Sequence, residues 1–280
     1  MERCDFLPVS AEEMHERGWW WYDALVVSGD AYVDHPSFGT AVISRVLEAE
    51  GLRVAVLAQP DWHDAEAFRA MGRPRLGVFI GAGNLDSMVA HYTAAKRRRS
   101  EDFYSPGKRS GCRPDRAAIV YCNRTREAFG PDMPIILGSL EASLRRFAHY
   151  DYWDDSVRRA ILFDAPADLL VYGMGEAATI EIAHRLKKKQ SVRTMTDIPG
   201  TGYITRDPSV CKFDHITLPS FEDVRDDRRL YAEATRTEYA EHDPIRGRAM
   251  IQPCEERYLV INPPAMPLDT KGLGRGAGVP

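Results

Sequence analysis

The sequence contains no pair of cysteines close enough to form a metal-binding or redox motif. Its closest two, Cys112 and Cys122, are ten positions apart, and the other three are Cys4, Cys211 and Cys254. The CxxC and CxxxCxxC spacings that hold a metal or a cluster on one loop are therefore absent. We interpret the five cysteines as reduced, mostly buried thiols and expect no metal site within these 280 residues.

Long apolar runs are also missing. Crossing a bilayer takes about 18 consecutive apolar residues, and no segment of the sequence approaches that length. The first ten residues contain acids and a proline where a secretion signal would have its apolar core. We therefore expect a cytoplasmic protein that makes no membrane contact.

The sequence also has no excess of positive charge. The formal net charge is −4, which argues against the electrostatic grip on phosphates that nucleic-acid binding needs. The block HYDYWDD at residues 149–155 has arginines on either side, but its interleaved acids cancel most of their field. We interpret the block as a polar network between the main domain and its neighbour, and expect no nucleic-acid partner.

Apolar, strand-like runs alternate with helical patterns through the first two thirds of the sequence. Each run ends in a turn that contains glycine or an acid, and a stretch long enough for one helix follows. Strand, turn and helix repeated in this order are typical of a parallel sheet with helices on its faces. We therefore predict an α/β fold, a doubly wound and mainly parallel five-stranded sheet, in a domain of residues 1–195. The expected strands are 24–28, 54–58, 76–80, 135–137 and 169–172, and the expected helices are 37–51, 64–71, 85–98, 116–129 and 176–189.

The remaining third of the sequence has a different pattern of apolar and polar residues. Residues 196–262 contain one helical pattern, at 221–240, and two short runs, 248–251 and 257–261, that predict a hairpin. We expect a small α+β extension there. Residues 263–280 have no apolar periodicity, so we expect a linker or a disordered tail.

Parallel sheets bind ligands beyond the carboxyl ends of their strands, so the turns after the predicted strands are the candidate site. The first turn carries Asp30, Asp34 and His35 directly before a helix. Three ionisable groups at a strand tip favour ligand binding. The alternative is a helix-capping aspartate and a histidine with local hydrogen bonds.

The third predicted strand ends in the sequence GAGN, with Gly81, Gly83 and Asn84. Glycines there let the backbone approach a phosphate or the edge of a cofactor. The motif is not the GxGxxG fingerprint of dinucleotide sites, and close packing between strand and helix explains it equally well.

The fourth and fifth tips add polar side chains to the same expected rim. Glu141, Ser143 and Arg145 follow the fourth strand, and Glu176 follows the fifth. The carboxylates are suited to bind hydroxyls or amides of a ligand, and the arginine to bind an anion. Each side chain could instead cap a helix or pair across loops. We identify no catalytic residue.

Several long strings of the sequence resemble the N-terminal region of the YgiQ family of radical SAM proteins. They are GDAYVDHPSFG, AQPDW, AGNLDSMVAHYTA, RPDRA, ILGSLEASLRR, AHYDYW, VRRA and VINPPAMPLDTKGL, and they run in order over nearly the whole chain. The resemblance implies an N-terminal domain similar to the cobalamin-binding wound fold. It also implies a following radical SAM barrel, in cis, whose CxxxCxxC motif binds a 4Fe-4S cluster and S-adenosylmethionine.

Two departures from the family pattern matter for cofactors. The sequence has no CxxxCxxC motif, so we expect a chain truncated before the barrel that binds no cofactor by itself. Cobalamin proteins often carry DxHxxG after the first strand, whereas Asp34, His35 and Gly39 have these residue types in another spacing. Cobalt ligation by His35 is therefore not expected.

Three functions remain open from the sequence. The first is a non-catalytic N-terminal domain that shapes or covers the substrate side of a radical SAM barrel, with unknown substrate. The second is a free-standing module that binds a small, cobalamin-like or nucleotide ligand at the rim. The third is an interaction domain that uses aromatic residues of segments 19–22 and 150–153.

Overall fold

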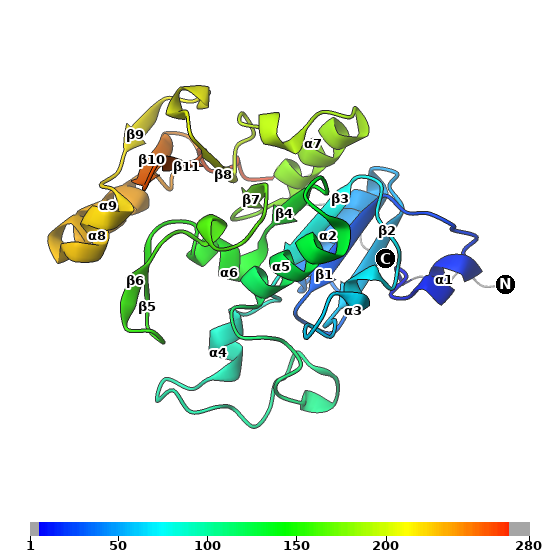
Figure 1. Cartoon of the computed structure of the whole chain (residues 1–280). Coiled ribbons are helices and arrows are strands. Elements are labelled where there is room, and N and C mark those ends of the chain that lie inside the picture. Colours follow the sequence, from blue (N-terminus) through cyan, green and yellow to red (C-terminus); the bar gives the residue numbers. More distant parts are fainter. Residues whose placement is uncertain (1–5, 269–280) are drawn as a thin grey trace.

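The computed structural model describes residues 6–268, and its core is one sheet of nine strands in the order β2-β1-β3-β4-β7-β8-β11-β10-β9. Figure 1 shows β9, β10 and β11 on the side of the sheet away from β2. The strands are β1 (Ala24–Ser28), β2 (Val54–Ala58), β3 (Gly77–Gly81), β4 (Ile135–Leu137), β7 (Leu169–Val171), β8 (Thr201–Thr205), β9 (His215–Thr217), β10 (Ala249–Cys254) and β11 (Arg257–Ile261).

The five strands β2, β1, β3, β4 and β7 are all parallel, as predicted from the sequence. Their residues are almost all buried, because helices cover both faces of this part of the sheet. Strands buried on both faces appear in a sequence as continuous apolar runs. The α/β, mainly parallel fold class is confirmed.

The sheet is wider than the predicted five strands. Strand β8 pairs antiparallel with β7, β11 pairs antiparallel with β8, and the β10–β11 hairpin continues to β9. Strand β7 would otherwise present a row of unpaired backbone groups, and β8 covers that edge. The strands of the expected C-terminal extension thus belong to the same sheet.

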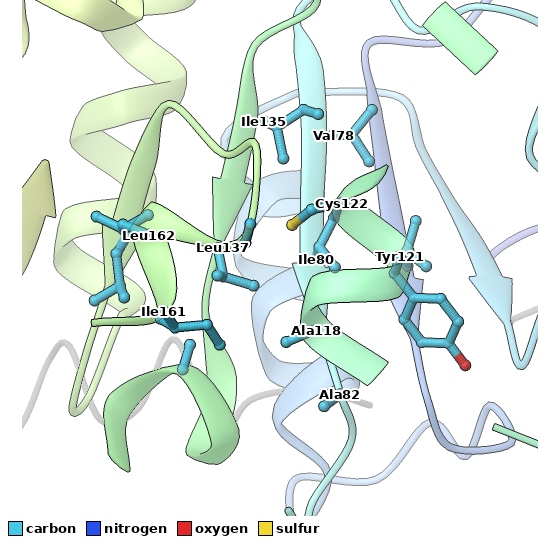
Figure 2. Close-up of a cluster of buried hydrophobic side chains, with 14 of the residues drawn as sticks. Val78, Ile80, Ala82, Ala118, Tyr121, Cys122, Ile135, Leu137, Ile161 and Leu162 are labelled. Carbon is cyan, nitrogen blue, oxygen red and sulfur yellow. The ribbon is translucent and has the colours of Figure 1, made fainter. Parts of the chain in front are cut away.

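Helices lie on both faces of the parallel strands, as a doubly wound fold requires. One face buries α2 and α7 against side chains such as Val26 and Phe79. The other buries α3, α5 and α6, and Figure 2 shows Val78, Ile80 and Leu137 of its cluster beside Cys122. The α-helices are α1 (Ala11–Glu16), α2 (Gly39–Ala49), α3 (Glu66–Arg69), α4 (Ser87–His91), α5 (Ala117–Phe129), α6 (Ser139–Leu144), α7 (Glu176–Lys187), α8 (Phe221–Asp226) and α9 (Arg228–Ala240).

Two of the predicted helices are interrupted in the structure. Helix α4 ends at His91, and the rest of the predicted helix 85–98 is a turn in which Lys96 has a φ of 57° and Tyr92 bridges to Arg98. The predicted helix 221–240 is split at Asp227, whose extended backbone ends α8 and whose side chain accepts the N–H of Arg229 to begin α9. In both cases local hydrogen bonds end the helix, although apolar residues continue at helical spacing in the sequence.

A small hairpin connects the sheet to the C-terminal helices. Strands β5 (His149–Asp151) and β6 (Ser156–Arg158) form it, and the backbone N–H of Tyr150 donates to the hydroxyl of Tyr231 on α9. At its tip Arg116 pairs with Asp151 at 2.9 Å and with Asp154 at 2.7 Å. This is the kind of polar network interpreted from the HYDYWDD block.

Candidate functional site

A cleft of about 340 Å³ lies at the carboxyl ends of β1, β3, β4 and β7, on the face covered by α2 and α7. After β1 the chain turns outward to β2, and it then crosses back to place β3 on the other side of β1. The cleft therefore lies beside the reversal of strand order, where wound α/β sheets bind their ligands.

The rim of this cleft consists largely of backbone. Six of its lining residues are glycines: Gly39, Gly81, Gly83, Gly138, Gly173 and Gly175. A side chain at Gly175 would place its Cβ 2.8 Å from Val171, and one at Gly81 would lie 3.1 Å from the Cβ of Ser139. Packing at the strand tips thus disfavours a side chain at these positions, which leaves main-chain atoms at the rim.

Glu176 is the only charged side chain among the residues that line the cleft. It is the first residue of α7, after Gly175, and the positive end of the helix stabilises its charge. Its Oε2 atom is buried and has no hydrogen-bond partner among the described residues.

Asn84 joins two of the turns that border the cleft. Its amide nitrogen donates to the carbonyl oxygen of Ser37 at 3.1 Å, and its Oδ1 accepts the N–H of Gly39 at 3.3 Å. The turn after β3 is thereby fixed to the turn that begins α2. Both polar groups of the Asn84 side chain are bonded within the protein.

Asp30 does not line the cleft. It is 2% exposed, lies 2.8 Å from Nη1 of the fully buried Arg113, and accepts the N–H of Asn84 at 2.7 Å. Burial raises the pKa of Asp30, and the guanidinium of Arg113 opposes that effect. A Cβ on Gly83 would lie 2.1 Å from the Asp30 carboxylate, so the glycine there makes room for this buried pair.

The other two groups of the first turn are also outside the cleft. Asp34 forms an ion pair with Arg45 of α2, which also bonds Glu48. His35 is exposed, and its Nδ1 accepts the N–H of Ser37 at 3.1 Å. The surroundings of His35 therefore do not fit the lower ligand of a cobalt ion bound in the cleft.

The residues after β4 have mainly structural contacts. Glu141 is fully buried and accepts the N–H of Ser87 at 2.8 Å and that of Ala118 at 3.0 Å, so one carboxylate serves the first turns of α4 and α5. Ser143 donates to the carbonyl oxygen of Ser139. Arg145 pairs with Asp86, and burial lowers the pKa of the arginine.

The structure thus separates the candidate residues into two groups. Gly81, Gly83, Asn84 and Glu176 line the cleft. The other six, Asp30, Asp34, His35, Glu141, Ser143 and Arg145, lie around the same strand ends but do not line it. Ligand binding by either group stays a prediction.

One polar cluster at the rim was not predicted. His91 is 1% exposed, its Nδ1 lies 2.6 Å from Asp115, and the hydroxyl of Tyr92 donates to the same carboxylate at 2.7 Å. In the sequence, His91 and Tyr92 lie 24 and 23 positions before Asp115, at the other end of the long loop after β3. Nothing in the sequence indicated that the two ends of this loop meet.

Other features bear on metals and membranes. Within residues 6–268, no group of three or more His, Cys, Asp and Glu side chains is arranged to hold a metal ion. The helices of the same part of the chain are all too short or too polar to cross a membrane.

Comparison of the sequence with known protein families gives the class of the protein. Residues 6–280 match the profile described as radical SAM N-terminal. The chain therefore belongs to the radical SAM N-terminal family, and the resemblance seen in its motifs is confirmed at that level.

Its relatives are named UPF0313 proteins. The chain is 52% identical to one from Clostridium botulinum (strain 657 / Type Ba4) over 280 residues, which are all of this chain and 44% of the relative. It is 50% identical to one from Clostridium perfringens (strain SM101 / Type A), of which it covers 42%. The chain thus spans less than half the length of these relatives.

A solved structure gives a weaker match. The radical S-adenosylmethionine methyltransferase TsrM from Kitasatospora setae, with cobalamin and a 4Fe-4S cluster bound, aligns with 64% of this chain and 26% of its own at 20% identity. The TM-score is 0.39.

Proposed function

We propose that this chain is the N-terminal domain of a YgiQ-type radical SAM protein and that it is not catalytic by itself. We also propose that the edge formed by the carboxyl ends of its parallel strands, which we call the carboxyl rim, contacts the downstream barrel. The observation that carries the proposal is the family match over residues 6–280 in a chain that covers 44% of its C. botulinum relative. The substrate stays open, and we expect the whole protein to act in the cytoplasm.

The path of the chain after the last strand supports contact at this rim. Strand β11 ends at Ile261, paired with Gly202 at the start of β8, beside the carboxyl end of β7. The N–H of Gly200 then donates to the carbonyl oxygen of Pro263 at 2.7 Å. A continuing chain would therefore leave the domain at the rim that carries the cleft.

Exposed apolar side chains lie near this exit. Leu140 and Leu144 of α6 are 44% and 59% exposed, and Met174, just after β7, is 55% exposed. Together we call these three residues the apolar rim. Large apolar side chains gathered at one edge favour a contact with another part of the protein, and the additional chain of the longer relatives is the partner that we propose.

We assign the 4Fe-4S cluster to the downstream part of the protein because the cysteines of this chain are far apart. A 4Fe-4S cluster that also binds S-adenosylmethionine needs closely spaced thiolates. Of the cysteines that the structure describes, Cys122 lies within α5 and Cys254 ends β10, while Cys112 and Cys211 lie in separate loops. Burial raises the pKa of Cys254 to about 11 and also raises that of Cys122, which disfavours the thiolate form.

Anaerobic reconstitution tests this assignment. The 280-residue chain and the full-length C. botulinum relative are each treated with iron and sulfide, then with dithionite and S-adenosylmethionine. We expect cluster absorbance and 5′-deoxyadenosine from the relative and neither from this chain. A stoichiometric cluster with cleavage in this chain would refute the proposal, as would the absence of both from the relative.

Hydrogen exchange tests the rim contact separately. In the full-length relative, the segments aligned with residues 138–146 and 172–176 should be more protected than in its isolated N-terminal part. Helix α3, which lies away from the rim, is the internal control. Equal protection of the rim in both forms would contradict the proposed contact.

A second candidate function is a free-standing module that binds a small, cobalamin-like or nucleotide ligand. The cleft of about 340 Å³ beside the reversal of strand order supports it. Thermal unfolding of this chain with cobalamin, nucleotides or S-adenosylmethionine tests it, since a ligand that binds the folded state raises the midpoint. No shift with any of these ligands would count against the module.

A further inference from the structure

We propose that the cleft binds an uncharged heterocycle with hydroxyl groups, of nucleoside size, and that Glu176 accepts hydrogen bonds from those hydroxyls. The inference rests on the second candidate function, binding of a small ligand by this domain itself, and narrows it to one chemical class. It does not depend on the downstream barrel.

One oxygen of the Glu176 carboxylate lacks a hydrogen-bond partner among the described residues. This atom, Oε2, is buried. A buried acceptor in that condition costs free energy, and folded proteins seldom keep one without a reason. A carboxylate that only stabilised the start of α7 could do so with both of its oxygens exposed to water. Because a carboxylate only accepts hydrogen bonds, the missing partner is a donor.

The helix N-termini at the cleft balance the charge of its carboxylate. Glu176 is its one charged lining residue, the N-termini of α2 and α7 reach it through Gly39, Thr40 and Gly175, and the six-residue α6 begins at its edge with Gly138 and Ser139. None of these helices has a side-chain hydrogen bond from its N-cap residue. Helix N-termini, each equivalent to at most roughly half a positive charge, offset the one carboxylate. The net charge of the cleft is therefore small and favours an uncharged ligand over a phosphate or an amine.

The interior of the cleft is small and mostly apolar. Below the glycine rim the cleft is lined by apolar side chains, including Val42 and Ile43 of α2, Phe79 of β3 and Val171 of β7. A volume of about 340 Å³ is at the lower end of the range for small-molecule sites. A flat heterocycle fits such walls, and its hydroxyl groups then reach the single carboxylate at the mouth. Carboxylates at the same edge of wound sheets bind ribose hydroxyls in this way.

Calorimetric titration of the 280-residue chain with three probes tests the class. The probes are adenosine, which is uncharged; AMP, which adds a phosphate to the same body; and 2-phenylethylamine, a cation with an apolar ring. We expect saturable binding of adenosine, and at least tenfold weaker binding of the other two. Glu176→Gln should weaken adenosine binding at least tenfold, because one acceptor oxygen is replaced by a donor.

A matched control lies on the same helix. Glu181→Gln removes a carboxylate of α7 that pairs with Arg185 and does not line the cleft, and it should leave adenosine binding unchanged. Without ligand, Glu176→Gln should lower the unfolding midpoint only slightly, because the favourable interaction of the carboxylate with the start of α7 is lost. A large drop in the midpoint would mean that the carboxylate has mainly a structural role, against the proposal.

The other outcomes of the titration also test the proposal. Tighter binding of AMP or of the amine than of adenosine would refute the ligand class and leave the second candidate function standing. Unchanged adenosine binding in Glu176→Gln would refute the role of the carboxylate. Binding of none of the three would refute the inference outright, while the reconstitution experiment would still decide the first proposed function.

Discussion

The guanidinium of Arg113 lies 2.8 Å from the carboxylate of Asp30, and neither side chain is more than a few per cent exposed. The same guanidinium donates to Asp102 at 2.8 Å and to the carbonyl oxygen of Ala82 at 3.2 Å. One arginine of the long loop after β3 thus joins the turn after β1 to the loop itself. The carboxyl rim depends on this buried triad.

Removal of this arginine should destabilise the domain strongly. Arg113→Met leaves two buried carboxylates without their counter-charge, and breaking a buried pair in this way costs about 3 to 5 kcal/mol. Urea unfolding at neutral pH measures the change. Arg193→Met is the control, because Arg193 is largely exposed and lies 3.6 Å from Asp168; its effect should be within about 0.5 kcal/mol. A small effect of Arg113→Met would show that the loop does not depend on the triad.

Glu141 offers a second test of the rim. In Glu141→Gln an amide donor replaces one carboxylate oxygen that now accepts the N–H of Ser87 or Ala118. We expect a loss of about 1 to 3 kcal/mol, the cost of a buried group without its partner. The control is Glu127→Gln, which changes a half-exposed carboxylate paired with Arg124. Equal stability of the two variants would contradict the capping role of Glu141.

Glu238 should make the stability of the protein depend on pH. Burial raises its pKa to about 7, against the attraction of Arg146. A carboxyl group whose pKa is higher in the folded state favours folding when protonated, so its contribution is lost as the pH rises from about 4.5 through 7. Glu238→Gln should therefore be more stable than the parent by about 2 to 3 kcal/mol at pH 8 and equally stable at pH 4.5.

Chemical unfolding of Glu238→Gln at both pH values tests this prediction. Glu233→Gln, an exposed change on the same helix, should show no pH-dependent difference. The same gain at pH 4.5 and pH 8 would show that titration of Glu238 is not the cause.

Cobalamin should not be ligated by His35. The ring is exposed, lies outside the cleft lining, and uses Nδ1 to accept the N–H of Ser37. The absorbance spectrum of cob(III)alamin mixed with the protein should be the same for the parent and for His35→Ala. A red-shifted spectrum that disappears in the variant would overturn this prediction.

The parallel half of the sheet could be predicted closely from the sequence. Strands β1, β2 and β4 have the expected bounds because each is a short apolar run with a clear turn after it. The position of β11 between β8 and β10 could not be predicted, since strand order depends on contacts between segments far apart in sequence. The predicted length of helix α4 was too great. The residues after His91 are of types common in helices, but they form hydrogen bonds with each other in a turn.

The arrangement of the strand tips could be predicted from the sequence, but the partners of their side chains could not. The tips of parallel strands share one edge, and Gly83 and Glu176 both line the cleft there, whereas Asp30 and Glu141 do not. The sequence alone could not tell that Asp30 faces Arg113, because that arginine comes from a loop 83 positions later. A polar side chain at a strand tip can face a ligand or a buried partner, and only the packing of the loop decides.

The place of β11 within the sheet has a consequence for synthesis of the protein. Strand β11 inserts between β8 and β10, which are both made earlier. While residues 257–261 are still inside the ribosome, these two strands each present an open edge, and such edges readily pair with other chains. The nascent domain can close its sheet only after Ile261 has emerged, so both edges stay open to other chains until then.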